Sequence, residues 1–308
     1  MYLAVFICKI MQKIQLSRIN MSYDIYGDSN LPPVLLIMGI GMSSKVCSRD
    51  FINLLLRKGL RVIIADNRDS GQSTHFSNAP ISMSVPVAIG RAFLRLPIPA
   101  PYSLEDMALD YSEFLNKIHV DRTHIIGISL GGMIAQTLAT IRPSQTSSLT
   151  IVMGSSGNPR TCFGKMKTVY SLWSYISSFD RTEEIEKSCY NIFNLLKSPN
   201  YHYNKDERQA LIKEVVEAGL DIHAIERQFL AIFSSGDRSN QLKTIKAPTL
   251  ILHGEDDPIV PLSAAKELVE IIPQASLNIF EKMGHDLPPI HFEKMADLIA
   301  SHIWNSEG

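Results

Sequence analysis

Short apolar runs alternate with helical patterns along most of the chain. Residues 34–38 and 61–65 are continuous apolar stretches, which are typical of strands covered on both faces of a sheet. The pattern predicts further strands at 123–128, 149–153, 249–252 and 277–280, and a strand hairpin at 13–26. Helices are predicted at 50–58, from residue 103, and at 133–139, 263–272 and 291–304. This alternation predicts the α/β class, with a mostly parallel central sheet covered by helices on both faces.

The alternation breaks between about residues 157 and 244. Helical periodicity continues there, at 183–196, 207–220 and 223–233, with few strand patterns. We therefore expect an all-helical insertion that covers the carboxyl edge of the sheet as a cap. The predicted division of the chain is a loosely ordered N-terminal arm at 1–12, a core made of 13–157 and 245–308, and a helical cap at 158–244.

Two local sequence patterns add detail to the predicted division of the chain. Ser103 and Asp106 have the spacing of a capping box, so a helix is expected to begin there. The segment 80–101 is apolar and contains five prolines. We expect it to form a loop that lines a pocket under the cap, in preference to a patch that touches a membrane.

Composition and charge exclude several classes of function. The chain has 308 residues, 45% hydrophobic and 20% charged, as in ordinary globular proteins. With 30 basic and 31 acidic residues its net charge is −1, so no nucleic-acid partner is expected. The four cysteines lack C-x-x-C spacing, which argues against a zinc or redox site and favours a reducing, cytoplasmic location. Residues 1–10 are apolar but too few to cross a bilayer, so no stable membrane insertion is expected.

The segment Gly127-Ile128-Ser129-Leu130-Gly131 carries the pattern G-x-S-x-G between a predicted strand and a predicted helix. In this setting the pattern forms a nucleophile elbow, a turn so tight that its flanking positions need glycine. A serine hydroxyl is a poor nucleophile until a base removes its proton, and a carboxylate must hold that base in the right tautomer. Ser129 therefore predicts a histidine and an acid elsewhere in the chain.

Position along the chain selects the base and narrows the acid. His285 follows the last predicted strand, at the edge where a parallel sheet presents catalytic groups. His124 begins its strand at the opposite edge, and His253 is expected to hydrogen-bond locally at the end of its own strand. The acid is expected in the loop after residue 252, where the residues alone leave three candidates open: Glu255, Asp256 and Asp257. The order serine, acid, histidine is the order of α/β-hydrolases.

A tetrahedral oxyanion also needs two preorganised hydrogen-bond donors. One is expected to be the backbone amide of Leu130, directly after the nucleophile. The other is expected from the loop at 38–44, where Gly39 and Gly41 let backbone amides point into the site. A tight turn would also explain these glycines, and the two roles are compatible.

Together these motifs resemble the α/β-hydrolase superfamily over residues 13–304. The segments 36–42, 66–73 and 131–136 are closely similar to the aclacinomycin methylesterase-like group. The resemblance implies that the acid is Asp257, the third residue after the loop glycine, and that Ile40 supplies the second oxyanion amide. It also implies structural roles for Arg68 and Asp69.

The chain is thus predicted to be a carboxylic-ester hydrolase that uses Ser129, Asp257 and His285 and needs no cofactor or metal. Its expected partner is a small-to-medium apolar ester, because the cap and the proline-rich segment would enclose an apolar pocket. The same triad is compatible with hydrolysis of amides or carbon–carbon bonds, and with perhydrolysis. The rival from another class is a ligand-binding sensor with negligible turnover.

Overall fold

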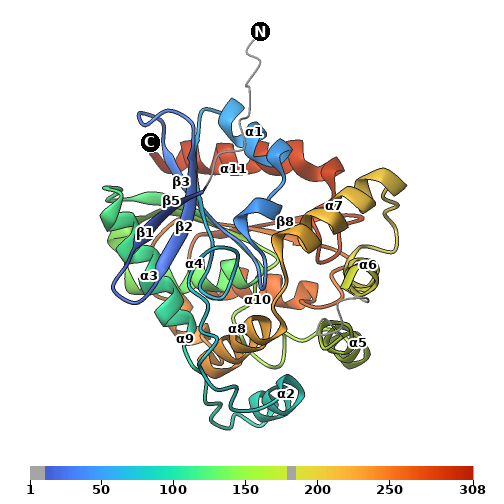
Figure 1. Cartoon of the computed structure of the whole chain (residues 1–308). Helices are drawn as coiled ribbons and strands as arrows, with labels where there is room; N and C mark the ends of the chain where they lie inside the picture. The colour runs from blue at the N-terminus through green and yellow to red at the C-terminus, as the bar shows by residue number, and fades with distance from the viewer. Residues whose placement is uncertain (1–10, 179–184, 308) are drawn as a thin grey trace.

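The computed structural model describes residues 11–178 and 185–307 (Figure 1). Residues 1–10, which make up most of the predicted N-terminal arm, lie outside the described residues. So do residues 183–184, where one cap helix was predicted to begin. Within the described ranges, no helix is both long enough and apolar enough to cross a membrane.

The described residues form one eight-stranded sheet in the order β1-β2-β4-β3-β5-β6-β7-β8. Its strands are β1 (Gln12–Gln15), β2 (Asn20–Tyr26), β3 (Pro33–Ile37), β4 (Arg61–Ala65), β5 (Thr123–Ile128), β6 (Thr146–Val152), β7 (Thr249–Gly254) and β8 (Ala275–Phe280). β1 and β2 pair antiparallel, as the predicted hairpin requires. β2 also pairs antiparallel with β4, and the other pairs are parallel. β5 lies between β3 and β6, so its carboxyl end opens at the centre of the sheet.

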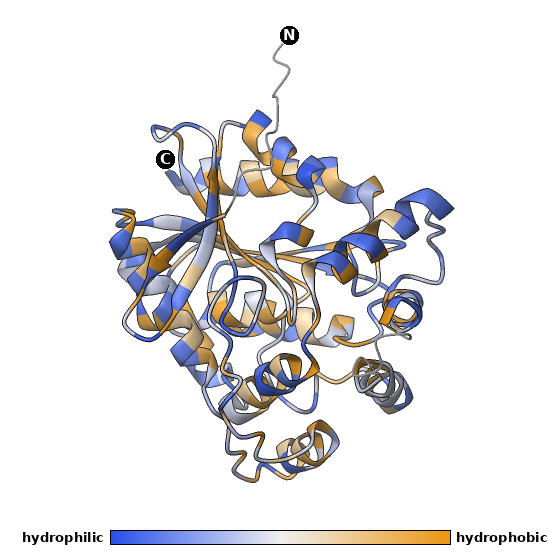
Figure 2. Cartoon of the chain, viewed as in Figure 1, coloured by the Kyte–Doolittle hydropathy of each residue, from blue (hydrophilic) through white to orange (hydrophobic). Residues whose placement is uncertain are grey.

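Helices cover both faces, and successive strand residues pack on opposite sides. Leu35 and Ile125 belong to one core, whereas Leu36 and Ile126 belong to the other. This is why successive residues of β3 and β5, such as Leu35 and Leu36 or Ile125 and Ile126, are apolar, as Figure 2 shows for the middle of the molecule. The first core is completed by α3 (Leu104–Lys117), α4 (Leu130–Ile141) and α10 (Leu262–Ile271), and the second by α1 (Arg49–Arg57) and α11 (Phe292–Glu307). Ser103 and Asp106 form the predicted capping box at the start of α3.

In the part of the chain that the structure describes, five helices lie between β6 and β7: α5 (Met166–Ile176), α6 (Ile185–Leu196), α7 (Lys205–Ala218), α8 (Ile222–Ser235) and α9 (Ser239–Leu242). Helices α5 to α8 share a small apolar cluster around Ile176, Cys189 and Ile225. Ile40, in the loop after β3, packs against the same cluster. The inserted helices therefore lie next to the predicted oxyanion loop.

The proline-rich segment 80–101 differs from the predicted loop, because it contains the helix α2 (Val85–Phe93). Pro86 stands in the first turn of this helix, where its missing N–H leaves no hydrogen bond unmade. The helix packs against α8. Its residues Val85 and Ile89 line the main cavity, so the segment lines a pocket as expected.

Candidate active site

The backbone at Ser129 is bent into a tight turn between β5 and α4. Ser129 has φ 54° and ψ −115°, a strained conformation for a residue with a side chain. A Cβ on Gly127 would lie 2.3 Å from the carbonyl oxygen of Gly131, and one on Gly131 would lie 2.1 Å from that of Ile37. Both positions therefore require glycine, which is the steric reason for the G-x-S-x-G pattern.

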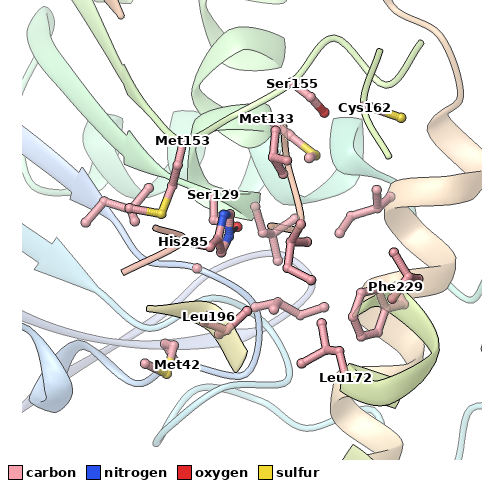
Figure 3. Close-up of a pocket in the computed structure, with 18 of the residues that line it drawn as sticks. Met42, Ser129, Met133, Met153, Ser155, Cys162, Leu172, Leu196, Phe229 and His285 are labelled. Carbon is pink, nitrogen blue, oxygen red and sulfur yellow. Dashed lines mark hydrogen bonds between the residues drawn. The ribbon is translucent and has the colours of Figure 1, made fainter. Parts of the chain in front are cut away.

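Three of the predicted residues meet in one hydrogen-bonded chain. Ser129 Oγ lies 2.9 Å from His285 Nε2, and His285 Nδ1 lies 2.7 Å from Asp257 Oδ2. The Asp257 side chain is 0% exposed and that of His285 is 12% exposed. Because an ionised carboxylate only accepts hydrogen bonds, Nδ1 carries the ring proton, and Nε2 of the neutral ring accepts from the serine hydroxyl. Figure 3 shows Ser129 and His285 side by side in the cavity wall.

The geometry also separates the three acid candidates. Oδ1 of Asp257 accepts from the backbone amides of Ile259 and Val260, at 2.9 and 2.8 Å, which leaves Oδ2 for the histidine. Asp256 instead accepts hydrogen bonds from the inserted segment after α6, and Glu255 is exposed. Asp257 is thus the carboxylate that the fold brings to His285.

Electrostatics distinguish His285 from His253 and His124. Burial lowers its pKa, but the charge of Asp257 and the hydrogen bond to it outweigh burial, so the pKa is raised from its usual value. His253 Nε2 donates to the carbonyl of Val260 at 2.8 Å, and burial lowers its pKa. His124 sits at the far end of β5, where Nδ1 lies 2.9 Å from the hydroxyl of Ser148. Both of these rings have local partners.

The predicted oxyanion amides lie near Ser129. Leu130 is the first residue of α4, and a Cβ on Gly39, just before Ile40, would lie 3.6 Å from the Cβ of Ser129. Across residues 11–178 and 185–307, neither the Ile40 amide nor the Leu130 amide donates a hydrogen bond to another protein group. Two unpaired donors beside a serine hydroxyl are what a developing oxyanion requires.

Gln228 on α8 holds this loop in place, and the sequence patterns did not single it out. Its Oε1 accepts from the amide of Gly41 at 2.7 Å, and its Nε2 donates to the carbonyl of Arg68 at 2.8 Å and to the hydroxyl of Ser70 at 2.9 Å. Gly41 has φ 65°, a left-handed conformation that suits glycine. One buried amide side chain therefore connects the inserted helices to the predicted oxyanion loop.

Replacing Gln228 with methionine is expected to lower kcat for ester hydrolysis by about ten-fold. Loss of a direct oxyanion donor costs about 10²–10³-fold, and a displaced loop weakens the donor without removing it. Steady-state kinetics with a soluble chromogenic ester would measure the change. Gln228→Glu is the matched control variant, because its carboxylate can still accept the hydrogen bond from the Gly41 amide. An unchanged kcat in folded Gln228→Met would contradict this role.

Arg68 and Asp69 are both buried in paired contacts. The Arg68 guanidinium donates two hydrogen bonds to Asp110 on α3, at 2.7 and 2.8 Å. Asp69 accepts two from Arg227 on α8, both at 2.8 Å, and one from the Tyr102 hydroxyl at 2.7 Å. Each charge meets a partner of opposite sign, and together they fix the turn after β4 to α3 and α8. Arg227 was missed because its partner lies 158 positions away.

The loops that carry Asp257 and His285 are also tied to the end of α6 and to the segment after it. The His285 amide donates to the carbonyl of Leu196 at 2.8 Å. The Tyr203 hydroxyl donates to Asp286 Oδ2 at 2.7 Å, and burial is the main reason that the pKa values of both groups are raised. Ser198 Oγ donates to Asp256 at 2.5 Å. The histidine loop and the acid loop therefore share one support.

A cavity of about 970 Å³ lies between the sheet edge and the inserted helices. Ser129 and His285 are in its wall, and most of the remaining lining is aliphatic or aromatic, including Met133, Leu172 and Phe229 (Figure 3). Among the residues that the structure describes, no group of three His, Cys, Asp or Glu side chains is placed to hold a metal ion. The site brings a serine hydroxyl, an imidazole and two unpaired backbone amides together in an apolar chamber.

Comparison with known proteins agrees with this fold. Residues 32–175 match a family described as alpha/beta hydrolase fold, and residues 198–294 match one described as serine aminopeptidase, S33. The chain is 25% identical to rhodomycin D methylesterase DnrP of Streptomyces peucetius, over 90% of this chain and 92% of that protein. It is 28% identical to a 2-hydroxy-6-oxononadienedioate/2-hydroxy-6-oxononatrienedioate hydrolase of Cupriavidus pinatubonensis, over 56% and 58%. The structure of an esterase from Exiguobacterium antarcticum aligns with a TM-score of 0.74 at 20% identity, over 96% and 100% of the two chains.

Proposed function

Because the chain belongs to the α/β-hydrolase superfamily, we propose that it is a serine hydrolase that cleaves a small-to-medium apolar carboxylic ester through an acyl-enzyme intermediate. The observation that carries the proposal is the hydrogen-bonded chain of Ser129, His285 and Asp257, with links of 2.9 and 2.7 Å, in the wall of an apolar cavity. A hydroxyl, an imidazole and a buried carboxylate in this order are the parts of an activated nucleophile.

In the proposed reaction, His285 Nε2 takes the hydroxyl proton as Ser129 Oγ attacks the ester carbonyl. The amides of Leu130 and Ile40 donate to the oxyanion of the tetrahedral intermediate. His285 then gives the proton to the leaving alcohol, and the acyl group stays on Ser129. A water molecule, deprotonated by His285, releases the acid and restores the serine. Asp257 holds the ring and stabilises the imidazolium during both steps.

The domain division supports an apolar substrate. We assign residues 158–244 as the cap and residues 13–157 and 245–308 as the core, since α5 to α8 have an apolar cluster of their own and enclose the cavity. A chamber lined mainly by aliphatic and aromatic side chains stabilises apolar groups better than a charged peptide. The enzyme is proposed to need no cofactor. A cytoplasmic location is also proposed, because Cys47, Cys162 and Cys189 are free thiols.

Hydrolysis of a carbon–carbon bond is the second candidate, because one relative is named as a 2-hydroxy-6-oxononadienedioate/2-hydroxy-6-oxononatrienedioate hydrolase. The same nucleophile and donors serve either bond, so the substrate alone separates the reactions. A panel of esters, anilides, diketones and peracid-forming assays would rank ester, amide, carbon–carbon and perhydrolase activity. Tight ligand binding without a burst of product would instead favour a sensor.

A fluorophosphonate probe tests the nucleophile directly. We expect it to modify Ser129, located by peptide mass spectrometry, and to abolish ester hydrolysis in proportion to labelling. The probe forms its bond only with an activated serine, so a denatured sample is the control. Labelling at another serine, or full ester hydrolysis in the labelled protein, would contradict the proposal.

In a plot of kcat/KM against pH, the fall in activity on the acid side is expected to have an apparent pKa above the ordinary histidine value of about 6.5. Asp257, with help from Asp286, raises the pKa of His285 despite its burial. Nε2 must be unprotonated to accept the serine proton, so activity falls as the pH drops through this raised pKa. In Asp257→Asn this apparent pKa is expected to decrease, and kcat to fall by about 10⁴-fold. A wild-type apparent pKa below the ordinary value would contradict this role for Asp257.

A further inference from the structure

Exposed apolar side chains gather on one end of the molecule. Leu94 and Tyr170 are each 71% exposed, and the other members are 44–53% exposed. They come from α2, the turn after it and α5, which pack against each other and lie at the end of the molecule away from the chain termini (Figure 1). We call this surface the α2–α5 face, defined by Val87, Phe93, Leu94, Leu96, Met166 and Tyr170.

Helix α2 is apolar on both of its sides. Val85, Ala88 and Ile89 are buried, and Val85 and Ile89 line the cavity, while Val87 and Phe93 are exposed. A surface helix of a globular protein normally turns polar residues to water. Arg91 is the one charged residue of this helix, whose sequence is VPVAIGRAF. A contiguous apolar surface of this kind marks an interaction site.

The two chain segments that supply the α2–α5 face carry positive charges and no negative ones. Residues 70–104 and 158–179 contain no aspartate or glutamate, although the whole chain has a net charge of −1. Asp237, from the loop after α8, lies 3.8 Å from Arg95. The basic residues of the two segments are Arg91, Arg95, Arg160, Lys165 and Lys167. Every full charge within these two segments is therefore positive, and among the described residues only Arg95 of the five is paired with a carboxylate. This positive charge complements an anionic surface.

The face is continuous with the cavity that contains Ser129. Leu96 and Pro97 are exposed and also line the cavity, so the cavity opens within the face. Phe93 stacks on Phe163 with 4.7 Å between ring centroids, and Phe163 stacks on Phe233 at 6.0 Å. Phe163 and Phe233 line the cavity. An apolar path thus leads from the protein surface to the candidate nucleophile.

We propose that the α2–α5 face binds reversibly to an anionic lipid surface, and that the cavity takes an amphiphilic acyl ester from it. Exposed aliphatic and aromatic groups enter the boundary between headgroups and chains, and Arg and Lys pair with anionic headgroups. The proposed binding to lipid does not depend on catalysis. The proposal that the substrate is an ester rests on the function proposed above.

Vesicle sedimentation of the full chain tests the docking step. We expect the protein to bind phosphatidylcholine vesicles that contain phosphatidylglycerol, and to bind pure phosphatidylcholine vesicles at least about ten-fold less tightly. Leu94→Glu is expected to weaken binding to the anionic vesicles by about ten-fold or more. Trp304→Glu is the matched control, since Trp304 is 47% exposed on α11 and should leave binding unchanged. Ser129→Ala should bind as the wild type does, whatever the reaction.

Activity then tests the source of the substrate. Leu94 does not line the cavity, so Leu94→Glu is expected to hydrolyse a soluble short-chain ester as the wild type does. Its rate on a long-chain ester carried in anionic vesicles is expected to fall about ten-fold. Absence of vesicle binding, or binding that Leu94→Glu leaves intact, would overturn the proposal. So would self-association that Leu94→Glu abolishes without any lipid binding. If vesicles bind but no ester is cleaved, the proposed function fails while docking holds.

Discussion

Ser129→Ala is expected to lower kcat for ester hydrolysis by about a million-fold, to the level left by the oxyanion donors and substrate binding. Alanine removes the nucleophile, but the backbone amides of Leu130 and Ile40 remain. KM should change little, because Oγ contributes to bond formation rather than to apolar binding. Single-turnover kinetics with a chromogenic ester would also show whether a burst of alcohol, the mark of an acyl-enzyme, disappears.

His285→Ala provides the matched control for that result. If the two residues act as one unit, the double variant should be no slower than either single variant. Losses that multiply in the double variant would contradict a shared nucleophile and base. Ester hydrolysis that survives in Ser129→Ala would move the chemistry to another residue and reject the proposed function.

Gly131→Ala is expected to destabilise the fold by about 3 kcal/mol or more. The new Cβ would lie 2.1 Å from the carbonyl oxygen of Ile37 and 2.8 Å from that of Met38, and both atoms belong to the backbone. A flexible side chain could move aside, but here β3 and the oxyanion loop would have to shift. The midpoint of thermal unfolding at a fixed scan rate is expected to fall by several degrees.

Gly90→Ala separates this clash from the ordinary effect of replacing glycine. Gly90 lies inside α2, and a Cβ there would meet nothing within 4 Å. Alanine is favoured over glycine in a helix by about 1 kcal/mol, so the midpoint should stay or rise slightly. Equal loss of stability in the two variants would show that close approach at Gly131 is not the cause.

Sequence patterns located the candidate triad as far as local geometry allowed. The elbow could be recognised because its glycines are required by contacts within a few residues and with the neighbouring strand. Asp257 could not be separated from Asp256 by residue type, since the distinction lies in which carboxylate turns toward His285 and which toward Ser198. That choice needed either the family resemblance or the folded loop.

Other features left no pattern to find. Gln228 and Arg227 look like the polar side of a helix, yet both are buried and hold the loops after β3 and β4. The helix α2 was predicted as a loop because its segment is rich in proline, whereas Pro86 stands where a helix tolerates it. Each of these features depends on which distant segment of the chain packs against the residues concerned.

Periodicity and short motifs were therefore enough to predict the alternating strands and helices, the mostly parallel sheet and the elbow at Ser129. Those features follow from interactions between residues close in sequence and from the burial of one or both faces of a strand. The pairing of Ser129 with His285 across 156 positions, the support of the oxyanion loop by Gln228 and the shape of the cavity follow from packing between distant segments. Distance in space, not spacing in sequence, determines whether a hydroxyl and an imidazole share a proton.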